Sequence, residues 1–257
     1  MSIIWIGILA SLGAGLMTGA GAVPVLFGRS VSQRANDAFL GFAAGVMLSA
    51  SYFSLILPGI EAAEGLYDSV LAAAAIAAAG IALGAVAVAA LNAWVPHRHF
   101  VAGPEGGDPG KLAKIWLFII AITIHNFPEG LAVGVGFGGG DVANGMSLAT
   151  GIGLQNAPEG LAVALALRGQ GYSRWRSFGV ALATGLVEPV GGALGVTLVH
   201  LSQHVLPWGL GFAAGAMLYI ISHEIIPETH RSGHQAAATT GLILGLILMM
   251  MLDVTLG

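Results

Sequence analysis

Two short segments in the middle of the chain combine histidine, carboxylate and amide side chains at a helical spacing. His125 and Glu129 lie four residues apart, and Gln155 and Glu159 repeat that spacing thirty residues later. Residues four apart share one face of an α-helix and lie about 6 Å apart along its axis. Imidazole nitrogens and carboxylate oxygens suit Zn²⁺ and neighbouring transition metals. The pattern therefore predicts a divalent-metal site between two helices.

The residues around these ligands extend the predicted site. Asn126 and Asn156 each follow a candidate ligand and can turn toward a second, adjacent ion. Glu188 lies deep in another apolar run and can complete that second position, with Glu159 as the bridge. Ionisable groups inside a membrane span are costly and mostly line an ion path. A hydrogen bond between helices remains the alternative role for each asparagine.

Long apolar runs carry these residues. The chain has 257 residues, of which 56% are hydrophobic and only 9% are charged, whereas about a quarter are charged in a soluble domain. A membrane helix needs roughly 20 mostly apolar residues. The runs that qualify are 3–27, 35–57, 68–94, 114–138, 142–167, 176–199, 206–228 and 235–256. We therefore predict an all-α integral membrane protein of eight transmembrane helices in a lipid bilayer, with residues 1–257 as a single domain.

Composition also excludes several partners and chemistries. The absence of cysteine excludes disulfides, thiolate metal ligands and cysteine nucleophiles. The chain has no basic patch of the kind that nucleic acid requires. No glycine-rich segment is followed by the Lys-Ser/Thr pair of a nucleotide-binding loop, so direct use of ATP is not expected.

The basic residues predict the topology. All nine fall in or at the edge of the connectors after the first, third, fifth and seventh runs: Arg29, Arg34, Arg98, Lys111, Lys114, Arg168, Arg174, Arg176 and Arg231. Connectors rich in Lys and Arg face the cytoplasm. Both termini are therefore expected outside the cytoplasm.

Two internal repeats relate the helices to one another. Residues 125–133 resemble residues 155–163. Residues 40–48 match residues 210–218 at eight of nine positions. In each pair the two runs cross the membrane in opposite directions. This predicts an inverted repeat of helices 1–3 and 6–8 around the central helices 4–5, as in many secondary transporters, which bind their substrate near the midplane.

The segments His125-Asn-Phe-Pro-Glu-Gly130 and Gln155-Asn-Ala-Pro-Glu-Gly160 resemble the signature helices of the ZIP family (Zrt-/Irt-like proteins), especially its bacterial branch. The resemblance covers essentially the whole chain. It implies zinc uptake into the cytoplasm, often with Cd²⁺, Fe²⁺ or Mn²⁺, by alternating access through a two-metal site. It also implies a location in the plasma membrane, here the bacterial inner membrane. Members slide one helix bundle against another and often form homodimers.

The resemblance also implies individual roles. By motif position, one ion is held by His125, Glu129, Gln155 and Glu159, and the other by Asn126, Asn156, Glu159, Glu188 and Glu129. His223 and Glu224 match the region near the cytoplasmic exit, so they are candidates for an exit relay, with interfacial polar residues as the alternative. Many members have histidine where this chain has Gln155, which leaves the preferred metal open.

An intramembrane zinc metalloenzyme, such as a hydrolase, is the alternative from another functional class. Zinc proteases use the motif His-Glu-x-x-His. The nearest string here is His223-Glu-Ile-Ile-Pro227, which lacks the second histidine. A transporter of protons or organic cations is a third alternative. We expect a transporter and not an enzyme.

Overall fold

The computed structural model describes residues 2–28, 31–94, 98–99, 103–104, 111–169, 171–231 and 233–256. Its helices are α1 (Ile3–Leu26), α2 (Gln33–Ser49), the π-helical η1 (Ala50–Ile56), α3 (Leu57–Tyr67), α4 (Val70–Trp94), α5 (Lys111–Gly138), α6 (Val142–Gly169), α7 (Arg174–Gly185), α8 (Glu188–Leu201), α9 (Val205–Ile220), the π-helical η2 (Ile221–Ile225), α10 (Ile226–Thr229) and α11 (Gln235–Leu256). Between α4 and α5, the two-residue strands β1 (Arg98–His99) and β2 (Gly103–Pro104) pair antiparallel.

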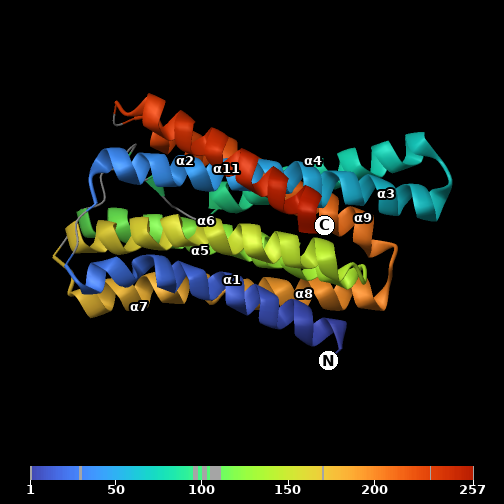
Figure 1. Ribbon diagram of the computed structural model, residues 1–257, viewed down its shortest axis with the longest axis horizontal. Coiled ribbons are helices and arrows are strands. Elements are labelled where there is room, and N and C mark those ends of the chain that lie inside the picture. Colours follow the sequence, from blue (N-terminus) through green and yellow to red (C-terminus); the bar gives the residue numbers. More distant parts are fainter. Residues whose placement is uncertain are drawn as a thin grey trace.

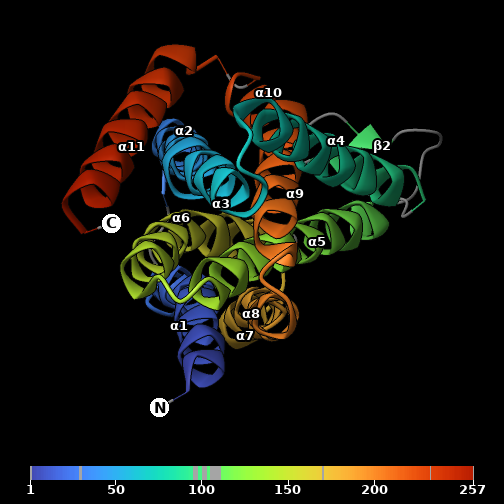
Figure 2. The same cartoon turned by 90° about the vertical axis from the view of Figure 1, so that its right-hand side faces the viewer.

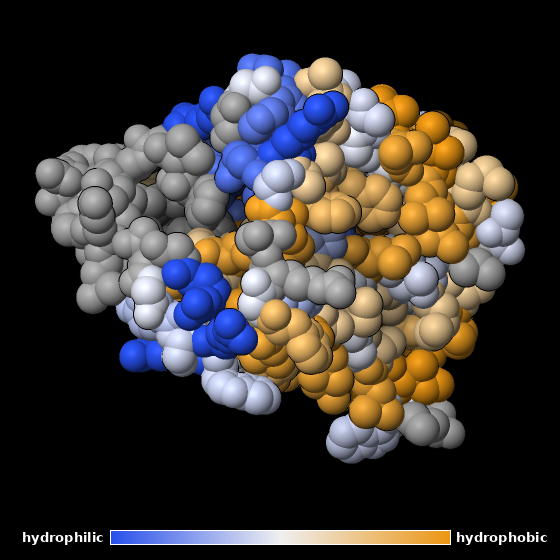
Figure 3. All heavy atoms as spheres, turned by 60° about the vertical axis from the view of Figure 1, so that its left-hand side comes forward, coloured by the Kyte–Doolittle hydropathy of each residue, from blue (hydrophilic) through white to orange (hydrophobic). Residues whose placement is uncertain are grey.

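Most of these helices have the length and composition of membrane spans. Within the described residues, six helical segments are long and apolar enough to cross a bilayer: Ile3–Leu26, Gln33–Tyr67, Val70–Leu91, Arg174–Leu201, Val205–Thr229 and Gln235–Thr255. Hydrophobic residues cover the right-hand flank of the molecule in Figure 3, and hydrophilic residues gather toward its left-hand side. The chain is an integral membrane protein built from helices, as its composition predicts.

The helices form two groups. One group contains α1 and α5–α8, and the other contains α2–α4 and α9–α11; the end-on view in Figure 2 separates them. The closest pairs are α1 with α6 and α5 with α8 in the first group, and α2 with α11 and α4 with α9 in the second. Helices α5 and α6, of 28 residues each, lie where the two groups meet. These two helices carry the paired motifs.

Described arginines of the connections lie at one end of the bundle. The connections after α1, α6 and α10 lie at one end, and both termini lie toward the other, with the α3–α4, α5–α6 and α8–α9 connections (Figure 1). Arg34, Arg168 and Arg174 belong to the first end, whereas Glu64 and Asp141 belong to the second. Arg29, which the topology prediction also used, lies outside the described residues.

Two prolines make the helix boundaries differ from prediction. The sequence predicted a connector over 58–67, but the helix continues through α3 to Tyr67. Pro58 stands in the first turn of α3, directly after the π-helical η1, so this helix contains a proline and does not end at it. The predicted helix 176–199 is divided at Leu186 and Val187, because Pro189, in the first turn of α8, has no N–H to continue the hydrogen bonds of α7. This division places Glu188 at the N-terminus of α8.

Glycines bring α1 against its neighbours. A Cβ added at Gly15 would lie 2.2 Å from the carbonyl oxygen of Gly185, and one added at Gly160 would lie 1.8 Å from that of Thr18. Only a residue without a side chain permits backbones to approach this closely, as small residues do in membrane helix packing. As a result α1 packs directly behind the part of α6 that carries Gln155 and Glu159.

Candidate metal centre

The predicted ligands are brought together in the interior of the bundle. Helix α5 supplies three of them, α6 supplies three, and the first turn of α8 supplies Glu188. None is more than 3% exposed: His125, Asn126, Glu129, Gln155, Asn156, Glu159 and Glu188. So many polar and ionisable side chains buried among apolar helices are expensive unless they are partnered. Their hydrogen bonds therefore show which atoms still need a partner.

Gln155 links α6 to α5. Its side-chain amide donates to Oε1 of Glu129 over 2.6 Å. Because a carboxylate only accepts hydrogen bonds, the NH₂ group of Gln155 must face Glu129. The remaining oxygens, Oε1 of Gln155 and Oε2 of Glu129, are buried without a hydrogen-bond partner among the described residues. The contact thus leaves two oxygens, one from each helix, available as ligands.

Asn156 makes the equivalent contact with α8. Its Nδ2 donates to Oε1 of Glu188 over 2.6 Å and to the backbone oxygen of Ala14 in α1 over 2.9 Å. Both partners are acceptors, so the amide orientation is dictated by its surroundings. The Ser11 hydroxyl of α1 donates to the backbone oxygen of Glu188 over 2.8 Å. Helix α1, which carries no predicted ligand, therefore holds two ligands in place.

Glu159 has no hydrogen-bond partner at either carboxylate oxygen among the described residues, although it is 2% exposed. Its carboxyl group is near enough to those of Glu129 and Glu188, and to the imidazole of His125, for direct electrostatic interaction. Three carboxyl groups this close repel one another when ionised. Glu159 is therefore the group with the greatest need for a cation.

The two predicted exit residues, His223 and Glu224 in η2, lie in different surroundings. Oε2 of Glu224 lies 2.8 Å from Nε2 of His125, and the Glu224 side chain is 10% exposed. His223 is exposed, and its ring lies 5.0 Å from that of Tyr219. Glu224 therefore contacts one of the predicted ligands, His125. Sequence reasoning missed this contact because 99 positions separate Glu224 from His125.

The Glu224 contact makes a prediction about metal affinity. An ionised carboxylate accepts a hydrogen bond from Nε2 of His125, which fixes the ring orientation and leaves Nδ1 with its lone pair. Groups that hold a metal-bound imidazole in this way contribute about 10- to 100-fold to affinity. We expect Glu224→Gln to weaken zinc binding by about that factor in isothermal titration calorimetry of the detergent-solubilised protein.

The neighbouring residue supplies the control for this prediction. His223→Gln changes an exposed ring of the same segment and should leave zinc affinity within about two-fold of the wild type. If Glu224→Gln binds zinc as tightly as His223→Gln, Glu224 does not orient His125.

Among the described residues, acidic and histidine side chains alone do not form a complete set of cation ligands. Within the described ranges, no group of three or more His, Asp or Glu residues is arranged to hold a metal ion. The amide oxygens of Gln155 and Asn156 are further potential donors, because both are buried without a hydrogen-bond partner among the described residues. Nitrogen and oxygen donors of this mixture suit a borderline ion such as Zn²⁺ better than Mg²⁺, which keeps water ligands.

A second polar cluster lies nearer the end that carries the termini. The Ser54 hydroxyl of η1 donates to Oδ1 of Asp253 in α11, and the Ser147 hydroxyl of α6 lies 3.3 Å from the same oxygen. The cluster joins three helices of both groups. It shares no residue with the candidate metal centre.

Sequence similarity to known proteins covers the segment that carries these residues. The sequence profile of a family described as ZIP Zinc transporter matches residues 108–253. The chain is 48% identical over 255 residues to the zinc transporter GufA of Myxococcus xanthus, covering 98% of this chain and 99% of that protein. It is 46% identical over 240 residues to the zinc transporter ZIPB of Bordetella bronchiseptica, covering 93% and 78%. The zinc transporter ZIP11 of Homo sapiens is 36% identical over 322 aligned positions, covering 94% of each chain.

Proposed function

The chain belongs to the ZIP family of zinc transporters, and from this membership we propose that it carries Zn²⁺ into the cytoplasm through the centre formed by α5, α6 and α8. The observation that supports this centre most is the set of buried oxygens without a hydrogen-bond partner among the described residues. At the centre they belong to Asn126, Glu129, Gln155, Asn156, Glu159 and Glu188. Unpaired buried acceptors destabilise a protein, and a divalent cation would satisfy them together.

The alternative of an intramembrane zinc hydrolase is set aside. The similar proteins are zinc transporters, and the family is a transporter family. Membership of this family also sets aside a carrier of protons or organic cations as the primary function. Zinc is therefore treated as the transported substrate.

We assign the ligands to two neighbouring positions. The first position would take His125, Glu129, Gln155 and Glu159, and the second would take Asn126, Asn156, Glu159 and Glu188, with Glu129 as a further ligand. The contacts support this division, because one amide of α6 faces Glu129 and the next faces Glu188. Glu159, with both oxygens unpartnered among the described residues, is suited to bridge two ions. Cd²⁺, Fe²⁺ and Mn²⁺ remain proposed additional substrates.

Alternating access is supported by symmetry in the packing. The closest helix pairs support the proposed repeat, because α1 with α6 corresponds to α8 with α5, and α2 with α11 corresponds to α9 with α4. The glycine contacts support the same correspondence. Gly160 meets the Thr18 carbonyl of α1, and Gly130 meets the Glu188 carbonyl of α8. Two halves with equivalent contacts can exchange conformations, which opens the centre to each side in turn.

The arrangement of the helices supports the rest of the proposal. We propose that α5 and α6 also cross the membrane, which makes eight spans in a single domain of residues 1–257. Because the basic residues gather at one end of the bundle, that end would face the cytoplasm and both termini would lie outside it. The membrane would be the plasma membrane, here a bacterial inner membrane. A homodimer remains a prediction.

Transport in phospholipid vesicles tests the proposed function. Purified protein is reconstituted in vesicles that contain a fluorescent zinc indicator, and Zn²⁺ is added outside. We expect the internal signal to rise well above that of protein-free vesicles, and Mg²⁺ in the same concentration should neither enter nor slow zinc entry appreciably. Equal zinc entry with and without protein would contradict the proposal.

A further inference from the structure

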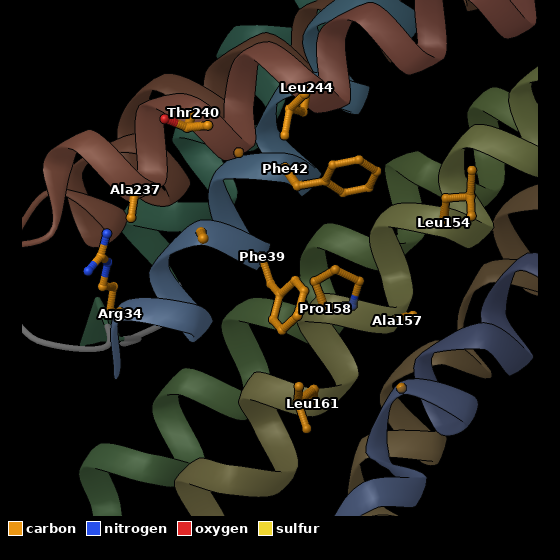
Figure 4. A pocket seen from close by; sticks show the side chains of 13 residues that line it. Arg34, Phe39, Phe42, Leu154, Ala157, Pro158, Leu161, Ala237, Thr240 and Leu244 are labelled. Atoms are coloured by element: carbon orange, nitrogen blue, oxygen red, sulfur yellow. The ribbon is translucent and has the colours of Figure 1, made fainter. Parts of the chain in front are cut away.

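A cavity of about 650 Å³ lies along the seam between the two groups of helices. Its walls come from α1, α2, α6 and α11, and Figure 4 shows side chains of the last three converging on it. The residues that matter for its chemistry are Arg34, Phe39, Phe42, Leu161 and Leu244. Its volume is in the range of ligand pockets, about 300–1,000 Å³. The cavity contains none of the predicted metal ligands.

The walls of this cavity are rigid on both sides. On one side, a Cβ at Gly21 of α1 would lie 1.8 Å from the Ala157 carbonyl oxygen of α6. On the other side, a Cβ at Gly41 of α2 would lie 2.1 Å from the Ala238 carbonyl oxygen of α11. These contacts hold α1 against α6 and α2 against α11, so each wall of the groove is a closely packed helix pair. The groove lies between the two pairs.

The groove is open toward the apolar flank of the molecule. Phe39 is 46% exposed and Leu244 is 57% exposed, and both line it. Apart from Arg34 and Thr240, all of its lining side chains are apolar or glycine. A groove of this kind on the flank of an integral membrane protein faces acyl chains. Its occupant must therefore be long, flexible and apolar over most of its length.

Arg34 adds a charge requirement at one end of the groove. Its guanidinium group lies at one end of the cavity in Figure 4, and Leu154 lies at the opposite end. No described carboxylate forms an ion pair or hydrogen bond with Arg34. Arginine recognises phosphate through parallel N–H donors, and cations near the membrane surface favour anionic lipids. Apolar walls that end in this arginine match an anionic phospholipid from acyl chain to phosphate.

We propose that this groove binds one anionic phospholipid, with an acyl chain between α2, α6 and α11 and the phosphate on Arg34. Two lining residues, Leu154 and Pro158, belong to the segment of α6 whose other side carries Asn156 and Glu159. A bound acyl chain would therefore fill the seam directly behind the candidate metal centre. The binding of the lipid does not depend on the proposed direction of transport.

Native mass spectrometry of the full chain tests this proposal. The protein is delipidated in detergent and incubated with phosphatidylglycerol or phosphatidylcholine that carry identical acyl chains. We expect the first phosphatidylglycerol to bind about five-fold more tightly than phosphatidylcholine, which corresponds to about 1 kcal/mol for one cation near the headgroup. Arg34→Gln should abolish this preference, whereas Arg231→Gln, which removes an exposed arginine outside the groove, should retain it.

A groove-filling variant tests the acyl-chain part separately. Ala237 lines the groove, whereas its neighbour Ala236 on the same helix is exposed outside it. Ala237→Phe should reduce tight binding of the first phosphatidylglycerol by at least about five-fold, and Ala236→Phe should not. Equal binding of both lipids by the wild type, or an unchanged preference in Arg34→Gln, would overturn the proposal. Unchanged binding in Ala237→Phe would place the acyl chain elsewhere and overturn it as well.

Discussion

Glu159→Gln should reduce zinc uptake and zinc binding by at least about 100-fold while the protein remains folded. Both oxygens of Glu159 are buried without a hydrogen-bond partner among the described residues, whereas Glu129 and Glu188 each have one oxygen that accepts from an amide. Removing one partner of a buried charge pair costs about 3–5 kcal/mol, which is more than 100-fold in affinity. Glutamine keeps the volume of the side chain and removes its charge, so packing is preserved.

Uptake into vesicles and calorimetric zinc titration measure this effect independently. Glu64→Gln is the matched control, because it makes the same change at an exposed position of α3. Its uptake and affinity should equal those of the wild type. Wild-type transport by Glu159→Gln would exclude Glu159 as a ligand, and the bridging role proposed for it would be lost.

Gly15→Ala should lower the free energy of unfolding by about 1–3 kcal/mol, the usual range for overpacking. The added Cβ would lie 2.2 Å from the carbonyl oxygen of Gly185, and backbone atoms cannot rotate away as a side chain can. Helix α1 must then separate from α7. Because α1 also holds Asn156 and Glu188 through Ala14 and Ser11, zinc affinity should fall together with stability.

A glycine two residues away supplies the control for this effect. An added Cβ at Gly13 has nothing within 4 Å, so Gly13→Ala should not destabilise the protein. Thermal or denaturant unfolding in one detergent compares the two variants directly. Equal stability of Gly15→Ala and Gly13→Ala would show that the α1–α7 contact is not as tight as the structure describes.

Sequence periodicity and composition were sufficient to predict a helical membrane protein and to propose the chemistry of the centre. A run of about 20 apolar residues has few other structures available in a bilayer, because every backbone polar group must be paired within it. The spacing of His125 to Glu129 and of Gln155 to Glu159 likewise places each pair on one face of its own helix. Both inferences use residues close together in the chain, where helix geometry alone decides which side chains are neighbours.

The helix ends were harder to predict from the sequence. The predicted span 35–57 stops before Pro58, whereas the helix continues beyond the π-helical segment η1 to Tyr67. Each π-helical segment, η1 and η2, ends two residues before a proline, Pro58 or Pro227, which lacks the N–H of a regular α-helical turn. In both places the helix continues past the proline. Membership of the ZIP family confirms the resemblance carried by the two motifs. It does not by itself assign the ligands.

The sequence by itself determined the membrane class, the paired His/Glu and Gln/Glu motifs and the family. Only the tertiary structure decided that Glu224 meets His125, that α1 supports Asn156 and Glu188, and that an apolar groove ends at Arg34. The physical reason is the distance along the chain. Helical spacing relates residues three or four positions apart, whereas these contacts join helices more than 90 positions apart, and they depend on which glycines permit two backbones to touch.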